Sequence, residues 1–407
     1  MKYRLGIGLL ALGNLWGMAE ALNRDRAVLS EELIPPSGAA YNHASTLAEA
    51  GDGTLIAAWF GGSDEGADDV SIWLSRYEGK AWSAASVIDD GRREDGKRYA
   101  CWNPVLVTDA SGTVYLYYKI SSKPAAVTEK GYENWWGCVK TSADRGRTWS
   151  ARAWLPSHPD PLLKNFGKRL IGPVKNKPLI LPDGTLLSGS STESDQWRVH
   201  VEIGKPGAWI REVSMVGPLA GGEAIQPAFL ALAQDFGKLQ MICRPRTGKT
   251  PYASFSYDLG RSWSALEPLT GIQTTAGLDA LTAGGAHFLA HNPAGARYPL
   301  MLARSRDGKA WEDVLPMLDQ DGVKRMDYPA LIRTKNGRIH VAHSWDRSHI
   351  KHLTLDADYL SDGGVAIRRN ARPSVRDAGQ GADASGRRLR HPTGPSDHRG
   401  RRFPVTE

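Results

Sequence analysis

Ser142-Ala-Asp144-Arg-Gly146-Arg-Thr-Trp149 and Ser256-Tyr-Asp258-Leu-Gly260-Arg-Ser-Trp263 are two copies of one pattern, S-x-D-x-G-x-x-W. Ser305-Arg-Asp307-Gly308-Lys-Ala-Trp311 is a third copy, one residue shorter. In such a segment the Asp carboxylate can accept hydrogen bonds from the N–H groups of a turn, and the Gly can adopt a positive φ. The Trp can then pack beneath the turn, between strands. The pattern therefore predicts a hairpin turn that recurs along the chain.

Two further segments, Ser75 to Trp82 and Gly204 to Trp209, resemble eroded copies of the same pattern. Successive tryptophans of the series lie 48 to 67 residues apart. That distance is the length of one four-stranded blade with its loops, so the repeat favours a β-propeller. The series consists of Trp82, Trp149, Trp209, Trp263 and Trp311.

Between these segments the chain is made of short apolar or β-branched runs, such as Leu55 to Phe60 and Val114 to Ile120. Turn pairs such as Asp52-Gly53 bound them, and no segment has a long helical period. The sequence predicts an all-β protein. The runs Ile339 to His343 and Ile350 to Leu355 supply strands for a sixth blade.

Both ends of the 407-residue chain differ from this pattern. Lys2 and Arg4 precede an apolar run, and Ala19-Glu20-Ala21 offers small residues for cleavage, so residues 1–21 are expected to be a signal peptide and the protein to be secreted or periplasmic. Residues 366–407 contain ten Arg and four acidic residues, most of the net charge of +7. They are expected to be a disordered, solvated tail. We expect no nucleic-acid partner, no membrane association after cleavage, and a monomer.

The three cysteines are far apart and form no CxxC pair, so neither a zinc site nor a disulfide framework is indicated. One disulfide with a free thiol and three reduced thiols both remain open for Cys101, Cys138 and Cys243. The sequence implies no metal and no organic cofactor.

With its repeated D-x-G-x-x-W turns, the chain resembles the sialidase (neuraminidase) family, in which these turns are called Asp-boxes. The resemblance implies a single six-bladed β-propeller over residues 22–365. In the family the boxes lie away from the active site, so the resemblance implies structural roles for Asp144, Asp258 and Asp307.

The resemblance also implies a chemistry. A sialidase holds a sugar carboxylate with three Arg, because the guanidinium fork matches a carboxylate and keeps its proton. The nucleophile is a Tyr activated by a Glu, since a carboxylate nucleophile would be repelled by the charge of the substrate. An Asp in a loop of the first blade serves as acid and base.

Several positions follow the order of these residues in the family. Tyr328 resembles the nucleophile and Glu223 its activating partner. Asp68 and Asp69, after Glu65 in the first-blade loop, resemble the acid/base. Either of Arg244 and Arg246 fits the second carboxylate-binding Arg, with Arg244 preferred, and Arg297 resembles the third. Further substrate-binding candidates on loops near strand ends are Arg347, Lys175 and Lys177.

The opening strand departs from the family pattern. Where sialidases have Arg-Ile-Pro, this chain reads Tyr41-Asn42-His43-Ala-Ser-Thr46. Asn42 and His43 are the nearest replacements for the first Arg; Asn42 can donate a hydrogen bond without charge, and His43 carries charge only if its pKa is raised. The missing Arg weakens the prediction that the substrate is sialic acid in particular. The broader prediction of an acidic sugar is unaffected.

Three hypotheses about function follow. The first is a retaining exo-glycosidase that removes a terminal acidic sugar, either sialic acid or a related ketodeoxy sugar acid or uronate. The second is a polysaccharide lyase for uronates, in which His43 and Tyr328 move protons while Arg neutralises the carboxylate. The third is a propeller that binds glycan or protein without catalysis, for which a Glu223–Tyr328 pair has no use.

Overall fold

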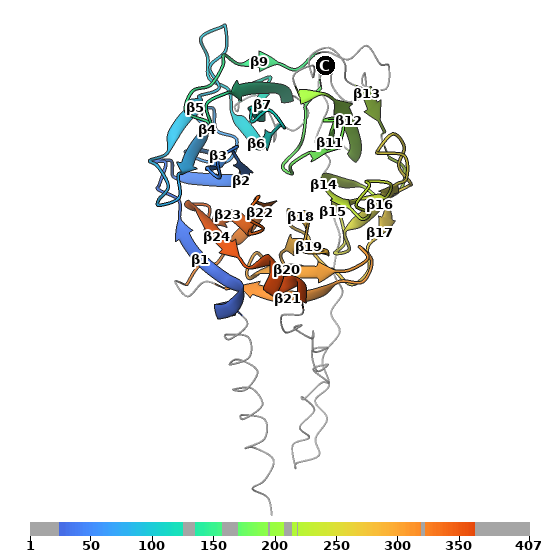
Figure 1. Cartoon of the computed structure of the whole chain (residues 1–407). Coiled ribbons are helices and arrows are strands. Elements are labelled where there is room, and N and C mark those ends of the chain that lie inside the picture. Colours follow the sequence, from blue (N-terminus) through green and yellow to red (C-terminus); the bar gives the residue numbers. More distant parts are fainter. Residues whose placement is uncertain are drawn as a thin grey trace, which may run out of the picture. The chain divides into compact units, whose positions relative to one another are not determined.

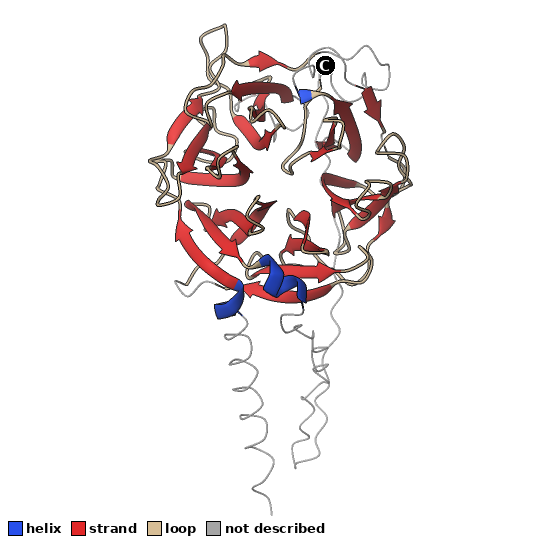
Figure 2. Cartoon of the chain, in the orientation of Figure 1, coloured by secondary structure: helices blue, strands red, loops and turns tan. Residues whose placement is uncertain are grey.

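The computed structural model describes residues 24–124, 135–156, 170–193, 196–206, 214–217, 219–318 and 322–362. Here the chain forms six four-stranded antiparallel sheets, arranged around a centre as the blades of a propeller (Figure 1). Helix is limited to short segments (Figure 2). The predicted all-β class and six-bladed propeller are confirmed. The predicted signal peptide and the tail 366–407 lie outside the described residues.

The blades follow one another along the chain. Blade 1 contains β2 (Tyr41–Glu49), β3 (Leu55–Gly62), β4 (Ser71–Tyr77) and β5 (Ser86–Asp89). Blade 2 contains β6 (Cys101–Thr108), β7 (Val114–Ser121), β8 (Trp135–Ser142) and β9 (Ala153–Trp154). Blade 3 contains β10 (Leu179–Ile180), β11 (Leu186–Glu193), β12 (Trp197–Gly204) and β13 (Ser214–Val216). Blade 4 contains β14 (Ala224–Ala231), β15 (Leu239–Pro245), β16 (Tyr252–Ser256) and β17 (Glu267–Pro268). Blade 5 contains β18 (Asp279–Ala283), β19 (Ala286–His291), β20 (Leu300–Ser305) and β21 (Glu312–Met317).

Blade 6 contains β22 (Met326–Arg333), β23 (Ile339–Trp345) and β24 (His349–Leu355), and β1 (Val28–Leu33) completes it. β1 pairs antiparallel with β24, and helix α2 (Ala357–Asp362) follows that strand. The sixth blade was predicted, but its closure by the N-terminal strand was not. Most β1 side chains are exposed, so the local pattern of this strand does not reveal its partner.

The repeated turns make the hydrogen bonds predicted for them. The carboxylate of Asp144 accepts from the backbone N–H of Thr148 at 2.8 Å and from its hydroxyl at 2.6 Å. Asp258 accepts the equivalent pair from Ser262, and Asp307, in the shorter copy, accepts from the backbone N–H groups of Lys309 and Ala310. Gly146 has a φ of 77°, and a Cβ there would lie 2.9 Å from Ile56 of the preceding blade. Gly is therefore needed for both the turn and the contact between blades.

The tryptophans of the repeat occupy equivalent places. Trp149 packs on the core between blades 1 and 2, Trp263 on that between blades 3 and 4, and Trp311 on that between blades 4 and 5. Trp82 lies in the core between blades 6 and 1. Each Trp thus contacts its own blade and the blade before it. Trp209 lies outside the described residues.

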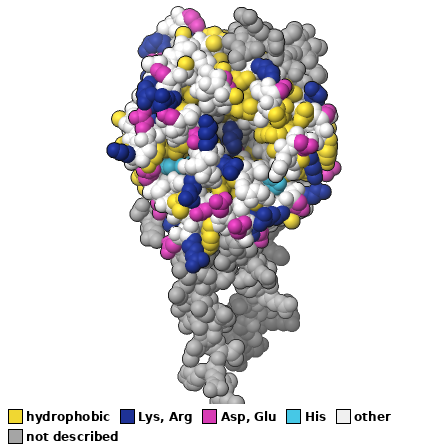
Figure 3. Space-filling view, viewed as in Figure 1, with side chains coloured by type: hydrophobic (Ala, Val, Ile, Leu, Met, Phe, Trp, Pro, Cys, Tyr) yellow, Lys and Arg dark blue, Asp and Glu magenta, His cyan; other side chains and the backbone are white. Residues whose placement is uncertain are grey.

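The innermost strands are buried on both faces because neighbouring blades cover them. Every residue of β2, β6 and β14 is buried except at the strand ends. Residues near the start of these strands line one hollow at the centre of the propeller. Residues near the ends of β2, β6 and β22 line another. The face drawn in Figure 3 is hollowed at its centre, and Lys and Arg side chains gather around it.

Cys101, Cys138 and Cys243 are buried and form no disulfide, which selects the reduced alternative. Among the described residues, no helix is long and apolar enough to cross a membrane, and no group of three or more His, Cys, Asp and Glu is arranged to hold a metal ion.

Candidate active site

A cavity of about 190 Å³ lies at the end of the propeller where the innermost strands begin. Residues from blades 1, 2, 3, 4 and 6 line it, together with Arg297 from the loop before β20. The lining residues are His43, Glu65, Trp102, Asn103, Glu193, Trp197, Gln226, Arg244, Arg297, Tyr328 and Arg347.

A backbone irregularity shared by three inner strands brings polar side chains to this cavity. Asn103, Gln226 and Tyr328 have φ values of 39°, 57° and 56°, and the strand pairing shifts register at each of them. Such β-bulges redirect a side chain. Each of the three is followed by a Pro, which has no N–H to donate to the sheet. The local sequence thus tolerates a break in pairing where the site needs one.

Tyr328 lies at the centre of the cavity. Its hydroxyl oxygen accepts a hydrogen bond from Arg244 Nη1 at 2.9 Å and one from Gln226 Nε2 at 3.3 Å. Its ring lies on that of His43, with centroids 4.1 Å apart. Two donors aimed at one phenol oxygen stabilise negative charge on it. The arrangement favours a nucleophilic or proton-transferring tyrosine.

Three arginines line the cavity, and the buried carboxylate of Asp327 organises two of them. Asp327 Oδ2 lies 3.5 Å from Arg297 Nη1 and 3.7 Å from Arg347 Nη2. Arg325, outside the cavity lining, lies 3.4 Å from the same oxygen. Arg244 is held separately, because its Nε donates to the carbonyl of Thr275 at 3.1 Å. A buried charge requires such partners, and here they orient guanidinium groups toward one hollow.

His43 is buried beneath the Tyr328 ring. Its Nδ1 lies 2.8 Å from Ser344 Oγ and 3.5 Å from Asp327 Oδ1. Burial, followed by the positive charges of Arg347, Arg297, Arg325 and Arg244, holds the His43 pKa well below its ordinary value. The imidazole is therefore neutral. A neutral ring cannot replace the charge of the missing first Arg.

Two carboxyl groups face the cavity. Glu65 accepts hydrogen bonds from the Tyr41 hydroxyl at 2.7 Å and from Arg347 Nη1 at 3.2 Å. Glu193 lies at the end of β11, opposite Trp197 in the β11–β12 hairpin. Burial raises the Glu193 pKa to about 7, Arg244 opposes this shift, and the charge of Glu65 adds to it. The cavity therefore contains one carboxylate held by donors and one carboxyl that keeps its proton near neutral pH.

Flat aromatic side chains form part of the cavity wall. Trp102 is buried, with its indole N–H donating to Ser121 Oγ at 2.8 Å, and Trp197 lies 5.4 Å from the Arg244 guanidinium carbon. Such faces suit the packing of a sugar ring.

Several predicted residues do not reach the cavity. Glu223 is exposed and pairs with Arg246 at 2.8 Å, so the expected Glu223–Tyr328 pair is not formed and neither Glu223 nor Arg246 lines the site. The residue of β14 that contacts Tyr328 is Gln226, three positions later. The β-bulge at Gln226 turns that side chain inward, while Glu223 lies before the strand and faces solvent.

Asn42 and Asp69 are occupied within the scaffold. Asn42 Oδ1 accepts from the indole of Trp59 at 2.8 Å, and its Nδ2 donates to the carbonyl of Ser348 at 2.8 Å. Asp69 accepts from the backbone N–H and the hydroxyl of Ser63, which closes the first-blade loop. Asp68 does not line the cavity either. The loop presents Glu65 to the site instead.

Lys175 is buried beneath the site and does not line it. Its ammonium donates to Asn176 Oδ1 at 2.9 Å and to the carbonyls of Leu278 and Pro329, and it lies 5.9 Å from the centre of the Tyr328 ring. Burial lowers its pKa to about 7. Lys175 therefore joins blades 5 and 6 to the segment before β10, a structural role. Lys177 pairs with Asp279 at 3.0 Å and lines the hollow at the opposite end of the propeller.

The sequence prediction included Tyr328, Arg244, Arg297, Arg347 and His43, and the structure brings all five together. It missed Asp327, Gln226, Glu193, Asn103 and the two tryptophans. One signal was available: Asn103, Gln226 and Tyr328 each precede a Pro near the start of a β run. No local signal marks Glu193, which reaches the cavity through the pairing of blade 3.

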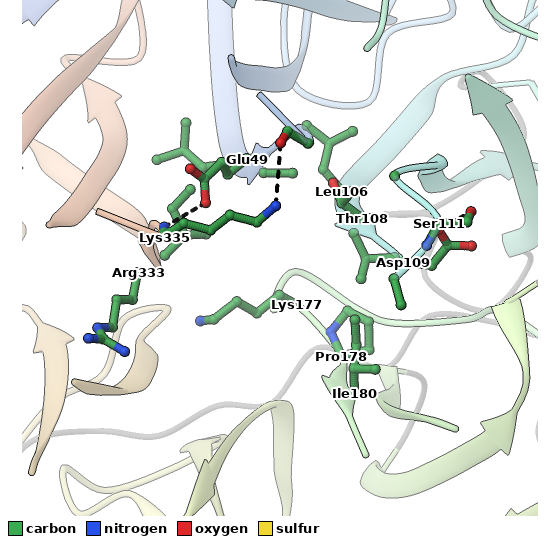
Figure 4. Close-up of a pocket in the computed structure, with 17 residues that line it drawn as sticks. Glu49, Leu106, Thr108, Asp109, Ser111, Lys177, Pro178, Ile180, Arg333 and Lys335 are labelled. Carbon is green, nitrogen blue, oxygen red and sulfur yellow. Dashed lines mark hydrogen bonds between the residues drawn. The ribbon is translucent and has the colours of Figure 1, made fainter. Parts of the chain in front are cut away.

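The hollow at the other end is larger, about 740 Å³, and some of its polar groups are engaged with one another (Figure 4). Lys335 donates to Glu49 and to the carbonyl of Gly51. Asp109 accepts from Ser111 and Thr113 of its own turn. Walls such as Leu106 and Ile180 are apolar. Of these two hollows, the smaller one brings a phenol, three arginines and two carboxyl groups together, and it is the candidate active site.

Comparison with known proteins agrees with this fold. The model of a family described as "BNR repeat-like domain" matches residues 53–341, more than half of the chain. The protein therefore belongs to this sialidase-like family of BNR-repeat proteins. No curated protein matches the sequence.

Solved structures share the architecture at low sequence identity. A protein of unknown function from Dyadobacter fermentans is 14% identical with a TM-score of 0.66, covering 81% of this chain and 98% of that one. The NanB sialidase of Streptococcus pneumoniae is 15% identical with a TM-score of 0.61, covering 80% of this chain and 70% of that one. An α-L-arabinanase of Penicillium chrysogenum, complexed with arabinobiose, is 16% identical with a TM-score of 0.55, covering 81% and 98%. These likenesses establish the fold alone.

Proposed function

We propose that the protein is a glycoside hydrolase that removes a terminal acidic sugar, either sialic acid or a related ketodeoxy sugar acid or uronate, with retention of configuration. The observation that carries the proposal is the convergence of Arg244, Arg297 and Arg347 on the cavity that holds the Tyr328 hydroxyl. Three fixed guanidinium groups in a hollow of about 190 Å³ suit one small carboxylate. The sialidase fold of a solved relative supports the same class of substrate.

Arg347 supplies the charge that the opening strand lacks. It lies in the turn between β23 and β24, and its carbonyl accepts from the backbone N–H of Asn42 at the start of β2. The Arg347 side chain therefore enters the cavity beside the place where the family resemblance leads one to expect the first Arg. A sequence comparison along β2 alone cannot find this substitution.

In the proposed reaction Tyr328 attacks the anomeric carbon while the arginines hold the carboxylate. A carboxylate nucleophile would be repelled by that carboxylate, whereas a phenol brings no charge into the ground state. Gln226, which replaces the expected Glu beside the hydroxyl, cannot take its proton. The proton passes to solvent, and Arg244 and Gln226 stabilise the resulting phenolate.

A lyase acting on uronates is the second candidate, and one observation favours it. The neutral ring of His43 lies on that of Tyr328, and its Nε2 has no hydrogen-bond partner among the described residues. A lyase needs one group to take the C5 proton and one to protonate the leaving oxygen, next to an Arg that neutralises the carboxylate. His43, Tyr328 and Arg244 meet that requirement.

The test is incubation of the purified protein with sialosides, uronides and ketodeoxy sugar glycosides, with products read by mass and by ultraviolet absorbance. Hydrolysis adds the mass of water and gives no ultraviolet-absorbing product. A lyase gives an unsaturated sugar that absorbs. Cleavage of none of these substrates, together with binding of one of them, would establish a non-catalytic glycan-binding propeller and refute both enzymes.

We also propose that the protein is exported, on the basis of residues 1–21 alone. Fractionation of the producing cell, with N-terminal sequencing of the exported form, tests this. An intact N-terminus in the cytoplasm would contradict it.

A further inference from the structure

We propose that Glu193 is the proton donor to the leaving oxygen in the reaction proposed above, in place of the first-blade Asp that the family resemblance suggests. This assignment rests on the proposed function and adds a catalytic residue to it. Three features carry the assignment: the position of the carboxyl in the cavity, the absence of donors to it, and the engagement of the competing carboxylates.

Glu193 is the last residue of β11, and its side chain lines the same cavity as Tyr328 and Arg244. Across the β11–β12 hairpin it is paired with Trp197, which also lines the cavity. The carboxyl therefore lies next to an aromatic face on which a sugar ring can pack. That position suits a group that must reach the glycosidic oxygen.

The Glu193 carboxyl accepts no hydrogen bond from any described residue, and its Oε1 atom is buried. A buried polar oxygen without a donor is costly, and such an atom in a cavity calls for an explanation. The charged groups that act on it are Arg244 from β15, Glu65 from the β3–β4 loop and Lys119 from β7. Burial outweighs the two cations and, with Glu65, raises the Glu193 pKa to about 7. A carboxyl that keeps its proton at neutral pH can donate it.

The other carboxylates near the site are engaged by donors or by cationic groups. Glu65 accepts from Tyr41 and Arg347, and Asp327 lies against three arginines. Asp69 is bound to Ser63 outside the cavity. Donors of this kind stabilise the ionised form and oppose proton donation. Glu193 differs from all three.

The step balances as follows. The bond between the anomeric carbon and the glycosidic oxygen breaks, its electron pair stays on that oxygen, and the Glu193 proton moves to it, so the aglycone leaves as an alcohol. The Tyr328 oxygen, having lost its proton to solvent, bonds to the anomeric carbon. Water then attacks that carbon, Glu193 takes a proton from the water, and the bond to Tyr328 breaks with its electron pair on the Tyr328 oxygen. That oxygen then regains its proton from solvent. The sum is hydrolysis, with both residues restored.

The experiment compares two glycosides of the acidic sugar that the wild type cleaves best: a 4-nitrophenyl glycoside, whose leaving group needs no proton, and an alkyl glycoside, whose leaving group does. For Glu193→Gln, kcat/KM is expected to fall on the order of 10²–10⁴-fold on the alkyl glycoside and less than about tenfold on the nitrophenyl glycoside. The comparison uses kcat/KM because kcat also includes the second step, in which Glu193 acts as a base on either substrate. Glu223→Gln, an exposed carboxylate removed outside the cavity, is the matched control and should behave as wild type.

The pH profile gives a readout that a structural role would not change. For the alkyl glycoside, wild-type kcat/KM should fall as the pH rises through about 7, where Glu193 loses its proton, and this fall should be absent in Glu193→Gln. The assignment would be overturned if Glu193→Gln lowered kcat/KM equally on both glycosides, or if kcat/KM of the variant still fell at alkaline pH. Either result would leave the proposed hydrolase function standing. A wild type that cleaves no acidic glycoside would overturn both. If the variant does not fold, the pH profiles of the wild type test the assignment. Its kcat/KM must then fall near pH 7 with the alkyl glycoside and not with the nitrophenyl glycoside.

Discussion

The prediction that most directly tests the carboxylate site compares Arg347→Ala with Arg325→Ala. Both guanidinium groups lie against the same buried oxygen of Asp327, at 3.7 Å and 3.4 Å, and both side chains are partly exposed. Only Arg347 lines the cavity. Each variant removes one guanidinium from the Asp327 cluster, and only Arg347→Ala removes charge from the proposed substrate site. Arg347→Ala also removes the contact with Glu65 at 3.2 Å. Arg325→Ala is the matched control.

The magnitude follows from the kind of contact removed. A hydrogen bond to a charged group contributes about 1.5–3 kcal/mol. Since about 1.4 kcal/mol corresponds to a factor of ten, Arg347→Ala should lower kcat/KM on the acidic sugar by about 10- to 150-fold. The same variant should lose little on a methyl ester of the same substrate, because the ester carries no negative charge for Arg347 to hold.

The assay is steady-state kinetics of wild type and both variants on the free acid and on its methyl ester, with melting temperatures measured alongside. Arg325→Ala should stay within a few-fold of wild type on both substrates, with a melting temperature close to that of Arg347→Ala. The reasoning is refuted if Arg347→Ala and Arg325→Ala lose equally on the free acid, or if Arg347→Ala loses as much on the ester as on the acid.

Three further predictions concern other parts of the protein. Tyr328→Phe should lose about 10²–10⁴-fold in turnover while still binding substrate. If steady-state kinetics show that the variant retains more than about a tenth of wild-type turnover, Tyr328 is not the nucleophile, and the lyase hypothesis with His43 becomes the preferred one. Glu193→Gln should raise the melting temperature at pH 8 more than at pH 5. The pKa of Glu193 in the folded wild type, about 7, exceeds the ordinary 4.5, so the stability that its protonated form contributes is lost as the pH rises through 7. An equal change in melting temperature at both pH values would contradict this. Asp144→Asn should lower the melting temperature at pH 7 without changing activity, and the difference from wild type should narrow below pH 3.8, because turn hydrogen bonds led by those of Thr148 lower the Asp144 pKa; a difference that does not depend on pH would argue against a role for the ionised carboxylate.

The blade repeat could be predicted because it is encoded by short segments of the chain. The hydrogen bonds of the turn at Asp144, the positive φ of Gly146 and the packing of Trp149 all depend on residues within a few positions of one another. Local interactions leave a local pattern, so the all-β class and the spacing of the blades could be predicted. The order of Arg244, Arg297 and Tyr328 along the chain, matched to the order of the family's residues, was enough to select them, although they lie on β15, before β20 and on β22.

Which side chains meet in the cavity depends on how the blades pack, and the sequence does not reveal it. A β-bulge turns Gln226 into the cavity and leaves Glu223 in solvent, a difference of three residues that the run of strand residues does not reveal. Arg347 reaches the start of β2 from the last blade, and Glu193 reaches the cavity from the third. The closure by β1 likewise pairs residues more than 300 positions apart. The protonation states of Glu193 and His43 also depend on the tertiary structure. Their pKa values are shifted by burial and by charges from other blades, and the residues next to them in the sequence predict neither the burial nor those charges.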